Sequence, residues 1–196
     1  MAVSKTKSVD DIKLAYDAGQ RDFGENKVQE LNEKADLLAS SCPNINWHFI
    51  GSLQSNKINN LLGTPNLVSI HSIDSIKLLN KLLNKKPDKR IGIFLQVNTS
   101  GEVEKSGFSE FSEIIQASSL IKSDSFYLQG LMTIGKIRTD DFENDAKACF
   151  LRLNEYKERL NSDDLELSMG MSSDYKIAID CGSDWIRIGS GIFGSR

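Results

Sequence analysis

The chain has 196 residues, of which 39% are hydrophobic and 26% charged, a composition typical of a soluble globular protein with one domain. The formal net charge of −3 argues against a nucleic-acid partner, and no apolar run approaches the roughly 18 residues of a membrane span. The three cysteines, Cys42, Cys149 and Cys181, are widely spaced and odd in number. We therefore expect free thiols and a reducing compartment, with neither a disulfide framework nor a zinc site.

Short apolar runs alternate with helical patterns from the start of the chain. Ser8 is the expected N-cap of the first helix, with Asp10 and Asp11 in its first turn, and Gly19 ends it. The first half predicts strands at residues 2–4, 22–25, 47–50 and 67–70, followed by helices at about residues 8–18, 28–38, 56–62 and 75–83.

The second half repeats this alternation. It predicts strands at residues 91–97, 127–134, 165–169 and 185–188, followed by helices near residues 108–117, 140–160 and 174–181 and, last, by a glycine-rich end. Residues 91–97 are nearly all apolar, as in a parallel strand covered on both faces. Eight such units favour an α/β protein with a (β/α)8 TIM-type barrel, in one domain over residues 1–196. An open doubly wound sheet has similar local signals and is the alternative.

In a barrel of this type the functional site lies at the carboxyl ends of the strands. Lys5 follows the first predicted strand. A lysine desolvated there would have a lowered pKa and could form a Schiff base with an aldehyde. A solvated lysine at a strand end, like Lys7 beside it, is the other interpretation.

Serine and glycine residues follow the last two predicted strands, where barrels commonly bind phosphate: Ser172, Ser173, Gly189, Ser190 and Gly191. Two ordinary turns are the alternative. Residues 189–194 also match G-x-G-x-x-G, but a dinucleotide site needs a following helix and an acidic residue about 20 positions later, which are not expected here. His48 and His71 fit core positions better than metal ligands.

Seven motifs occur in a characteristic order. They are residues 2–7 (AVSKTK), 23–26 (FGEN) with 28–30 (VQE), 47–51 (WHFIG) with 53–57 (LQSNK), 97–98 (VN) with 105–107 (KSG), 130–132 (GLM), 167–172 (LSMGMS), and 187–189 (RIG) with 192–194 (IFG). Together they resemble the pyridoxal phosphate homeostasis protein family, whose fold-type III barrel is similar to the N-terminal domain of alanine racemase. The resemblance covers nearly the whole chain. The family typically has a helix ahead of the first strand, and we expect this sequence to lack it.

The resemblance implies a site for pyridoxal 5′-phosphate (PLP). Lys5 matches the lysine that forms the internal aldimine, and Asn26 matches an asparagine near it. Ser172, Gly189 and Ser190 match phosphate-binding positions, with Met171 beside them, and Arg187 matches an arginine that faces the pyridine nitrogen.

Arg187 suggests what the bound cofactor is used for. A guanidinium only donates hydrogen bonds, so it would keep the pyridine nitrogen unprotonated and weaken PLP as an electron sink. The resemblance therefore implies a protein of intracellular PLP (vitamin B6) homeostasis without established turnover. A minimal PLP-dependent racemase or lyase is the alternative, and a PLP-independent enzyme acting on a sugar phosphate is a third hypothesis. PLP and PLP-dependent apo-enzymes are the expected partners of a monomer in the cytoplasm or a mitochondrial pool.

Overall fold

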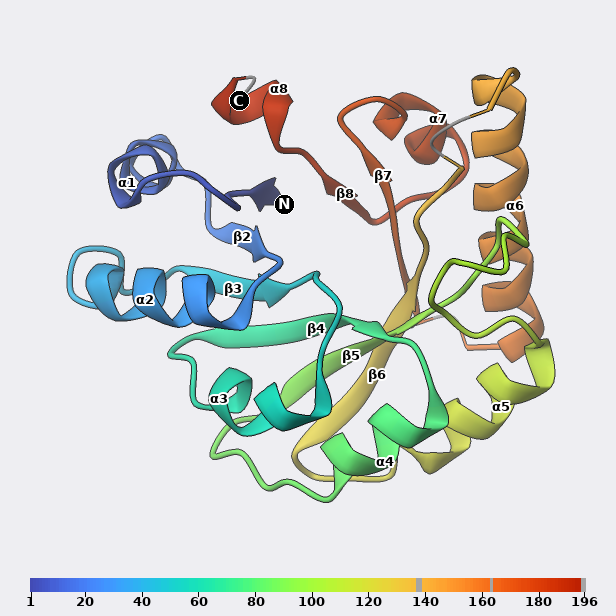
Figure 1. Ribbon diagram of the computed structural model, residues 1–196, viewed down its shortest axis with the longest axis horizontal. Helices are drawn as coiled ribbons and strands as arrows, with labels where there is room; N and C mark the ends of the chain where they lie inside the picture. Colours follow the sequence, from blue (N-terminus) through green and yellow to red (C-terminus); the bar gives the residue numbers. More distant parts are fainter. Residues whose placement is uncertain (137–138, 163, 195–196) are drawn as a thin grey trace.

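The protein, represented by a computed structural model, is described over residues 1–136, 139–162 and 164–194 (Figure 1). The domain expected over residues 1–196 thus includes residues 137–138, 163 and 195–196, which lie outside the described part. Helices surround a central sheet, and the strands of that sheet follow one another in chain order. This is the arrangement that the alternating sequence pattern predicts.

Eight parallel strands are found among the described residues. They are β1 (Ala2–Val3), β2 (Asp22–Glu25), β3 (Asn46–Phe49), β4 (Leu67–Ile73), β5 (Ile91–Gln96), β6 (Phe126–Met132), β7 (Glu166–Met171) and β8 (Trp185–Arg187). The first and last strands meet, because Ala2 bridges to Ile188 and the Val3 N–H donates to the Ile188 carbonyl at 2.7 Å. The sheet is therefore closed into a barrel, and the open doubly wound alternative is wrong.

The described helices are α1 (Val9–Asp17), α2 (Val28–Leu38), α3 (Ile58–Leu62), α4 (Ile76–Leu83), α5 (Phe111–Leu120), α6 (Phe142–Leu160), α7 (Tyr175–Asp180) and α8 (Ser190–Phe193), with a 3-10 turn at Ser55–Lys57. Ser8 caps α1 as expected, with Asp11 completing a capping box. One expectation needs correction. Helix α5 starts at Phe111 rather than near residue 108, because Phe108 bridges to Val97 and is buried. The glycine-rich end includes a single helical turn, α8.

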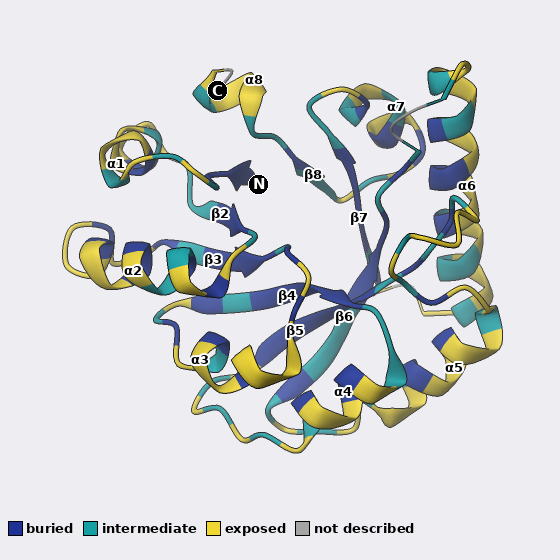
Figure 2. Ribbon diagram, viewed as in Figure 1, coloured by how far each residue is buried: buried dark blue, intermediate teal, exposed yellow. Residues whose placement is uncertain are grey.

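Burial follows the strands and the inner faces of the helices (Figure 2). In β5 every residue except the last is buried, as the apolar run predicts. In α4 the buried side chains are Leu78, Leu79 and Leu82, which share one face of the helix. All three cysteines are free and buried, in agreement with the sequence. Within the described residues, no helix combines the length and the apolar character that a bilayer crossing requires.

Both histidines are core residues, as their sequence context predicts. His48 is 2% and His71 0% exposed, and the His71 ring stacks on Phe94 with centroids 4.0 Å apart. Burial lowers the pKa of His48 and lowers that of His71 well below its usual value. The folded protein therefore holds both rings neutral at pH values where the unfolded chain protonates them.

Acid is expected to destabilise the protein from just below neutrality. Since the unfolded histidines titrate at about pH 6.5 and the folded ones at lower pH, the unfolded state binds more protons in this window. The free energy of unfolding should fall as the pH decreases from about 6.5, by up to ~2.7 kcal/mol per pH unit for two protons. Urea titrations at pH 7.5 and 5.5 measure this loss. Equal stability at both pH values would contradict it.

Candidate functional site

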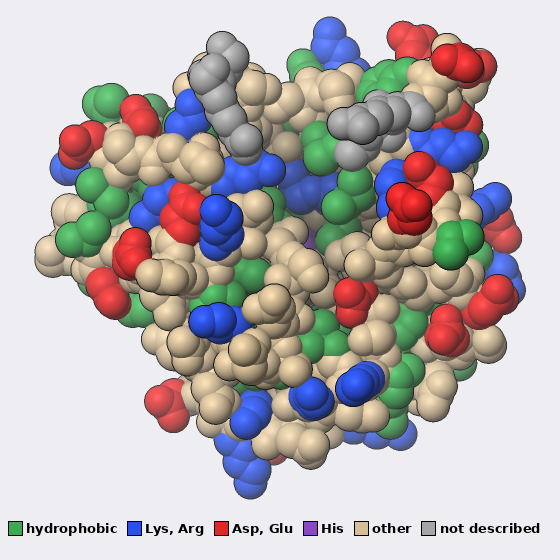
Figure 3. Space-filling view, viewed as in Figure 1, with side chains coloured by type: hydrophobic (Ala, Val, Ile, Leu, Met, Phe, Trp, Pro, Cys, Tyr) green, Lys and Arg blue, Asp and Glu red, His purple; other side chains and the backbone are tan. Residues whose placement is uncertain are grey.

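A pocket of about 410 Å³ opens at the carboxyl end of the barrel. Six of the seven residues predicted for the site line it: Lys5, Met171, Ser172, Arg187, Gly189 and Ser190. The remaining lining residues include Lys7, Ile50 and Ser173. Figure 3 shows lysine and arginine side chains around a central hollow on this face, with a histidine visible in its depth. Residues from β1, β7 and β8 that are far apart in sequence therefore meet in one place.

Lys5 lies in a tight turn that leaves β1. The Lys7 N–H donates to the Ser4 carbonyl at 3.0 Å, and between them Thr6 has a φ of 65°. A β-branched residue is rare in this left-handed region, so the turn persists because its surroundings fix it. One of these contacts joins the Thr6 N–H to Glu30 Oε1 at 2.5 Å. The turn presents Lys5, which is partly exposed, to the pocket.

Beneath this turn lies a buried ion-pair network, which we did not predict from the sequence. Lys34 Nζ is 2.7 Å from Glu25 Oε1 and 2.7 Å from Glu30 Oε1, and it donates to the Ser4 carbonyl at 2.8 Å. Ser4 Oγ also donates to Glu25, which is 0% exposed. Burial raises the pKa of Glu25, although the Lys34 ammonium opposes that shift. The network ties α2 and β2 to the residue that precedes Lys5.

Arg187 closes the inner side of the pocket. It is 6% exposed, its Nη1 donates to Ser168 Oγ at 2.9 Å, and its Nη2 donates to the Thr133 carbonyl at 2.8 Å. Burial lowers its pKa to about 10, partly opposed by Asp174, so the guanidinium remains charged at neutral pH. Of its five N–H groups, these two contacts use two, which leaves donors for a ligand in the pocket.

The serine and glycine positions after β7 and β8 converge as the sequence predicts. Ser172 Oγ accepts a hydrogen bond from the Gly189 N–H at 3.2 Å, which ties the two loops together. Behind them, Gly170 has a φ of 93°, and a Cβ atom there would be 2.5 Å from Ala178. A glycine is needed at this position for α7 to pack close to β7. Ser172, Ser173 and Ser190 all line the pocket.

Asn26 is the predicted site residue that does not line this pocket. It lines a separate hollow of about 310 Å³, together with Ser52, Gln54 and Lys57. Its backbone packs tightly on the end of β3, since a Cβ atom at Gly51 would be 2.0 Å from the Asn26 carbonyl oxygen. The structure thus brings six predicted residues together and places Asn26 in a different hollow.

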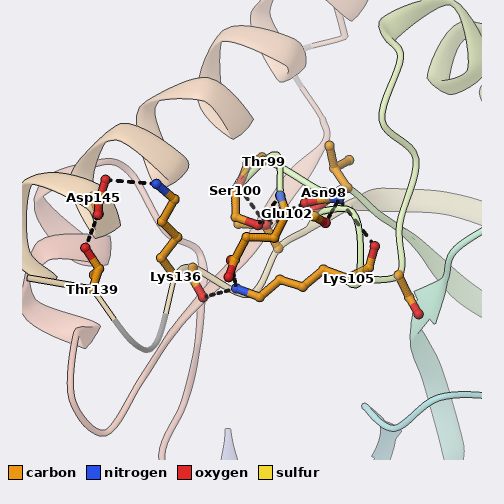
Figure 4. Close-up of polar contacts among 12 residues, drawn as sticks. Asn98, Thr99, Ser100, Glu102, Lys105, Lys136, Thr139 and Asp145 are labelled. Carbon is orange, nitrogen blue, oxygen red and sulfur yellow. Dashed lines mark hydrogen bonds and ion pairs between the residues drawn. The ribbon is translucent and has the colours of Figure 1, made fainter.

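A third hollow, of about 350 Å³, adjoins the pocket through Ile50 and is lined by Asp74, Asn98 and Lys105 among others. The loop that bounds it is held by its own polar contacts (Figure 4). Lys105 Nζ donates to the Gly135 carbonyl at 3.1 Å, and Asn98 Nδ2 donates to the Glu102 carbonyl at 2.9 Å. These contacts fix the position of the loop. No group of side chains in the described ranges could hold a metal ion.

Comparisons with known proteins identify the family and the fold. The family model for the alanine racemase N-terminal domain matches residues 1–196. The pyridoxal phosphate homeostasis protein of Mus musculus is 45% identical over 210 residues, covering 100% of this chain and 76% of its own length. The structure of PipY from Synechococcus elongatus PCC7942 with PLP bound has a TM-score of 0.86 at 32% identity, covering 99% of this chain and 91% of PipY. Alanine racemase from E. faecalis shares the fold, with a TM-score of 0.76 at 18% identity over 100% of this chain and 53% of the racemase.

Proposed function

The chain belongs to the pyridoxal phosphate homeostasis protein family, and from this membership we propose that it binds PLP covalently through Lys5 and acts in PLP homeostasis. The observation that carries the proposal is the convergence of Lys5, Arg187 and Ser172 in one pocket. The pocket volume of about 410 Å³ lies within the range of roughly 300–1,000 Å³ found for small-molecule sites.

The donors in the pocket fit the chemistry of PLP. The Lys5 amine would bind the aldehyde carbon, and the hydroxyls of Ser172 and Ser190 with the backbone at Gly189 would hold the phosphate. Met171 would flank the phosphate side, and Arg187 would face the pyridine nitrogen. We retain Asn26 in the proposed site, because it directly follows Glu25, whose carbonyl accepts a hydrogen bond from the N–H of the pocket residue Ile50.

We propose a holding and transfer role rather than racemisation. PLP, when bound, supplies an electrophilic carbon and an electron sink, and the sink is weak when the pyridine nitrogen stays unprotonated. The charged Arg187 donates only, so it favours that unprotonated state. Among the described lining residues there is no histidine, tyrosine, cysteine or carboxylate, and the other amine, Lys7, already donates to the Phe193 carbonyl at 2.9 Å. A racemase needs a second acid–base group opposite its lysine.

Reduction with borohydride tests the proposal directly. The purified protein incubated with PLP should develop the visible absorbance of a Schiff base, and borohydride should fix the cofactor on the peptide that contains Lys5. Addition of L-alanine should release or exchange PLP without forming D-alanine. A protein that stays colourless, or a label on another peptide, would contradict the proposed site. Formation of D-alanine would favour the racemase alternative.

We also propose the setting in which this role is carried out. A monomer in the cytoplasm, or in a mitochondrial pool, would pass PLP to PLP-dependent apo-enzymes. Three buried free cysteines suit a reducing compartment. Sedimentation of the PLP-loaded protein tests whether it is a monomer. Reactivation of an apo-enzyme by the loaded protein, in the presence of a trap for free PLP, tests the transfer.

Replacing Ser172 with alanine is expected to weaken PLP binding about tenfold, because a hydrogen bond to a charged phosphate is lost and the Gly189 N–H loses its partner. Pyridoxal, which lacks the phosphate, should bind the variant as well as it binds the wild type. Equilibrium titration of both ligands measures the difference. Equal weakening for the two ligands would argue against a phosphate contact at Ser172.

A further inference from the structure

A run of buried polar side chains crosses the barrel interior beneath the pocket. It connects the carboxyl end of the barrel to a carboxylate at the amino end. The first five members are 0–6% exposed, and the side chain of the last is 32% exposed. In order, they are Arg187 of β8, Ser168 of β7, His71 and Ser69 of β4, His48 of β3 and Asp22 of β2.

The contacts at the pocket end join three strands. Arg187 Nη1 lies 2.9 Å from Ser168 Oγ, and Ser168 Oγ lies 2.9 Å from His71 Nδ1. Ser168 thus links the guanidinium to the ring, and its hydroxyl can accept from one neighbour while donating to the other.

The contacts continue to the opposite end of the barrel. His71 Nε2 lies 2.8 Å from Ser69 Oγ, and Ser69 Oγ lies 2.6 Å from His48 Nδ1. His48 Nε2 then lies 3.0 Å from Asp22 Oδ1. The direct distance between the two histidine nitrogens is longer, at 3.3 Å, so the serine is the better bridge.

The two ends fix the direction of every hydrogen bond. Arg187 can only donate, and ionised Asp22 can only accept. Each serine and each neutral histidine between them accepts one bond and donates one. One proton order therefore satisfies all five contacts: both histidines are neutral with the proton on Nε2, and each serine hydroxyl points at the Nδ1 of the next histidine.

The surroundings support this order. The hydrogen bond from His48 lowers the pKa of Asp22, which keeps that end ionised. His48 also faces Glu166 of β7, the Met1 ammonium and the Trp185 ring, whose centroid is 5.0 Å away. His71 faces His48, Arg187 and the stacked Phe94. The His71 ring is completely buried, and Arg187 beside it is positively charged. Both effects favour a neutral ring.

We propose that this run of hydrogen bonds, from Arg187 to Asp22, makes Ser168 and His71 positioning residues for the cofactor pocket. It holds Arg187 as a donor, with its remaining N–H groups toward the pocket, and anchors that orientation to Asp22 at the far end of the barrel. The inference rests on the proposed function, because Arg187 is the residue proposed to face the pyridine nitrogen. The proton order itself is a property of the protein without ligand.

The proton order is tested by NMR on the unliganded protein with ¹⁵N-labelled histidine. Long-range ¹H–¹⁵N spectra distinguish the two neutral tautomers and the imidazolium. At neutral pH both rings should be neutral with Nε2 protonated. A ring with its proton on Nδ1, or a charged ring, would contradict the proposed proton order, whether or not the protein binds PLP.

The link to the cofactor is tested with Ser168→Ala and two ligands, PLP and its analogue with a benzene ring in place of pyridine. The variant should bind PLP about tenfold more weakly, because the Arg187 and His71 atoms lose their shared partner. The analogue offers no ring nitrogen, so its affinity should not change. Ser72→Ala is a matched control, since Ser72 is 2% exposed and its hydroxyl has no partner among the described residues. Equal weakening for both ligands would overturn the positioning role.

Rescue by a conservative substitution separates positioning from packing. A glutamine at position 71 can accept from Ser168 and donate to Ser69, whereas a leucine can do neither. His71→Gln should therefore keep most of the preference for PLP over the analogue, and His71→Leu should lose it. Loss in both variants would overturn the role of His71. A wild type that binds neither ligand would instead overturn the proposed function and the link to the cofactor, while NMR would still decide the proton order.

Discussion

Replacing Lys5 with alanine is expected to abolish covalent attachment of PLP while leaving the barrel folded. Lys5 is a partly exposed residue in a turn, and no hydrogen bond or ion pair of its ammonium is found among the described residues, so its removal leaves no buried group without a partner. The phosphate and ring contacts proposed for Ser172 and Arg187 remain in place. The variant should therefore bind PLP weakly and reversibly, with no cofactor retained on the protein after borohydride treatment and denaturation.

Lys7→Ala is the matched control for this experiment. Lys7 lines the same pocket two residues away, but its Nζ already donates to the Phe193 carbonyl at 2.9 Å. The control variant should retain the visible absorbance and the reducible label. If Lys7→Ala loses the label and Lys5→Ala keeps it, Lys7 forms the covalent bond and our assignment to Lys5 is wrong.

The order of the elements and the closed barrel could be predicted because they depend on local patterns. Alternation of apolar runs with helical spacing marks each βα unit, and parallel connections of this kind allow few topologies. The same logic placed Lys5 and Ser172 at strand ends, and hence at one mouth. The start of α5 was misplaced because Phe108 looks like the first apolar residue of a helix, whereas it pairs with Val97.

Features that depend on contacts across the barrel could not be predicted in this way. The bond between His71 and Ser168 joins residues 97 positions apart, and it exists because of the strand register. Asn26 follows a strand like its neighbours, yet close packing on Gly51 puts it beside a different hollow. Lys34 did give a signal, because it lies three residues after Leu31 on the buried face of α2. A charged residue on an apolar face requires a buried partner.

Replacing Lys34 with methionine is expected to be among the most destabilising single changes in the protein. It leaves Glu25, which is 0% exposed, without its cation, and the second carboxylate oxygen of Glu25 already lacks a partner among the described residues. Removing one partner of a buried ion pair typically costs about 3–5 kcal/mol, since the other charge stays buried and uncompensated. The change also removes the donor to the Ser4 carbonyl, so PLP binding at Lys5 should weaken. Urea unfolding at pH 7 measures the stability change.

Two further variants show whether burial of the charge is the cause. Lys13 forms an ion pair with Asp17 at the same 2.7 Å distance, but both side chains are about half exposed, so Lys13→Met should change stability little. Combining Glu25→Gln with Lys34→Met removes the stranded charge while the amide can still accept from Ser4 Oγ. The double variant should therefore be more stable than Lys34→Met alone. Two results would contradict the stabilising role of the buried network beneath the Lys5 turn. One is a stability loss in Lys34→Met as small as that in Lys13→Met, and the other is a double variant less stable than Lys34→Met.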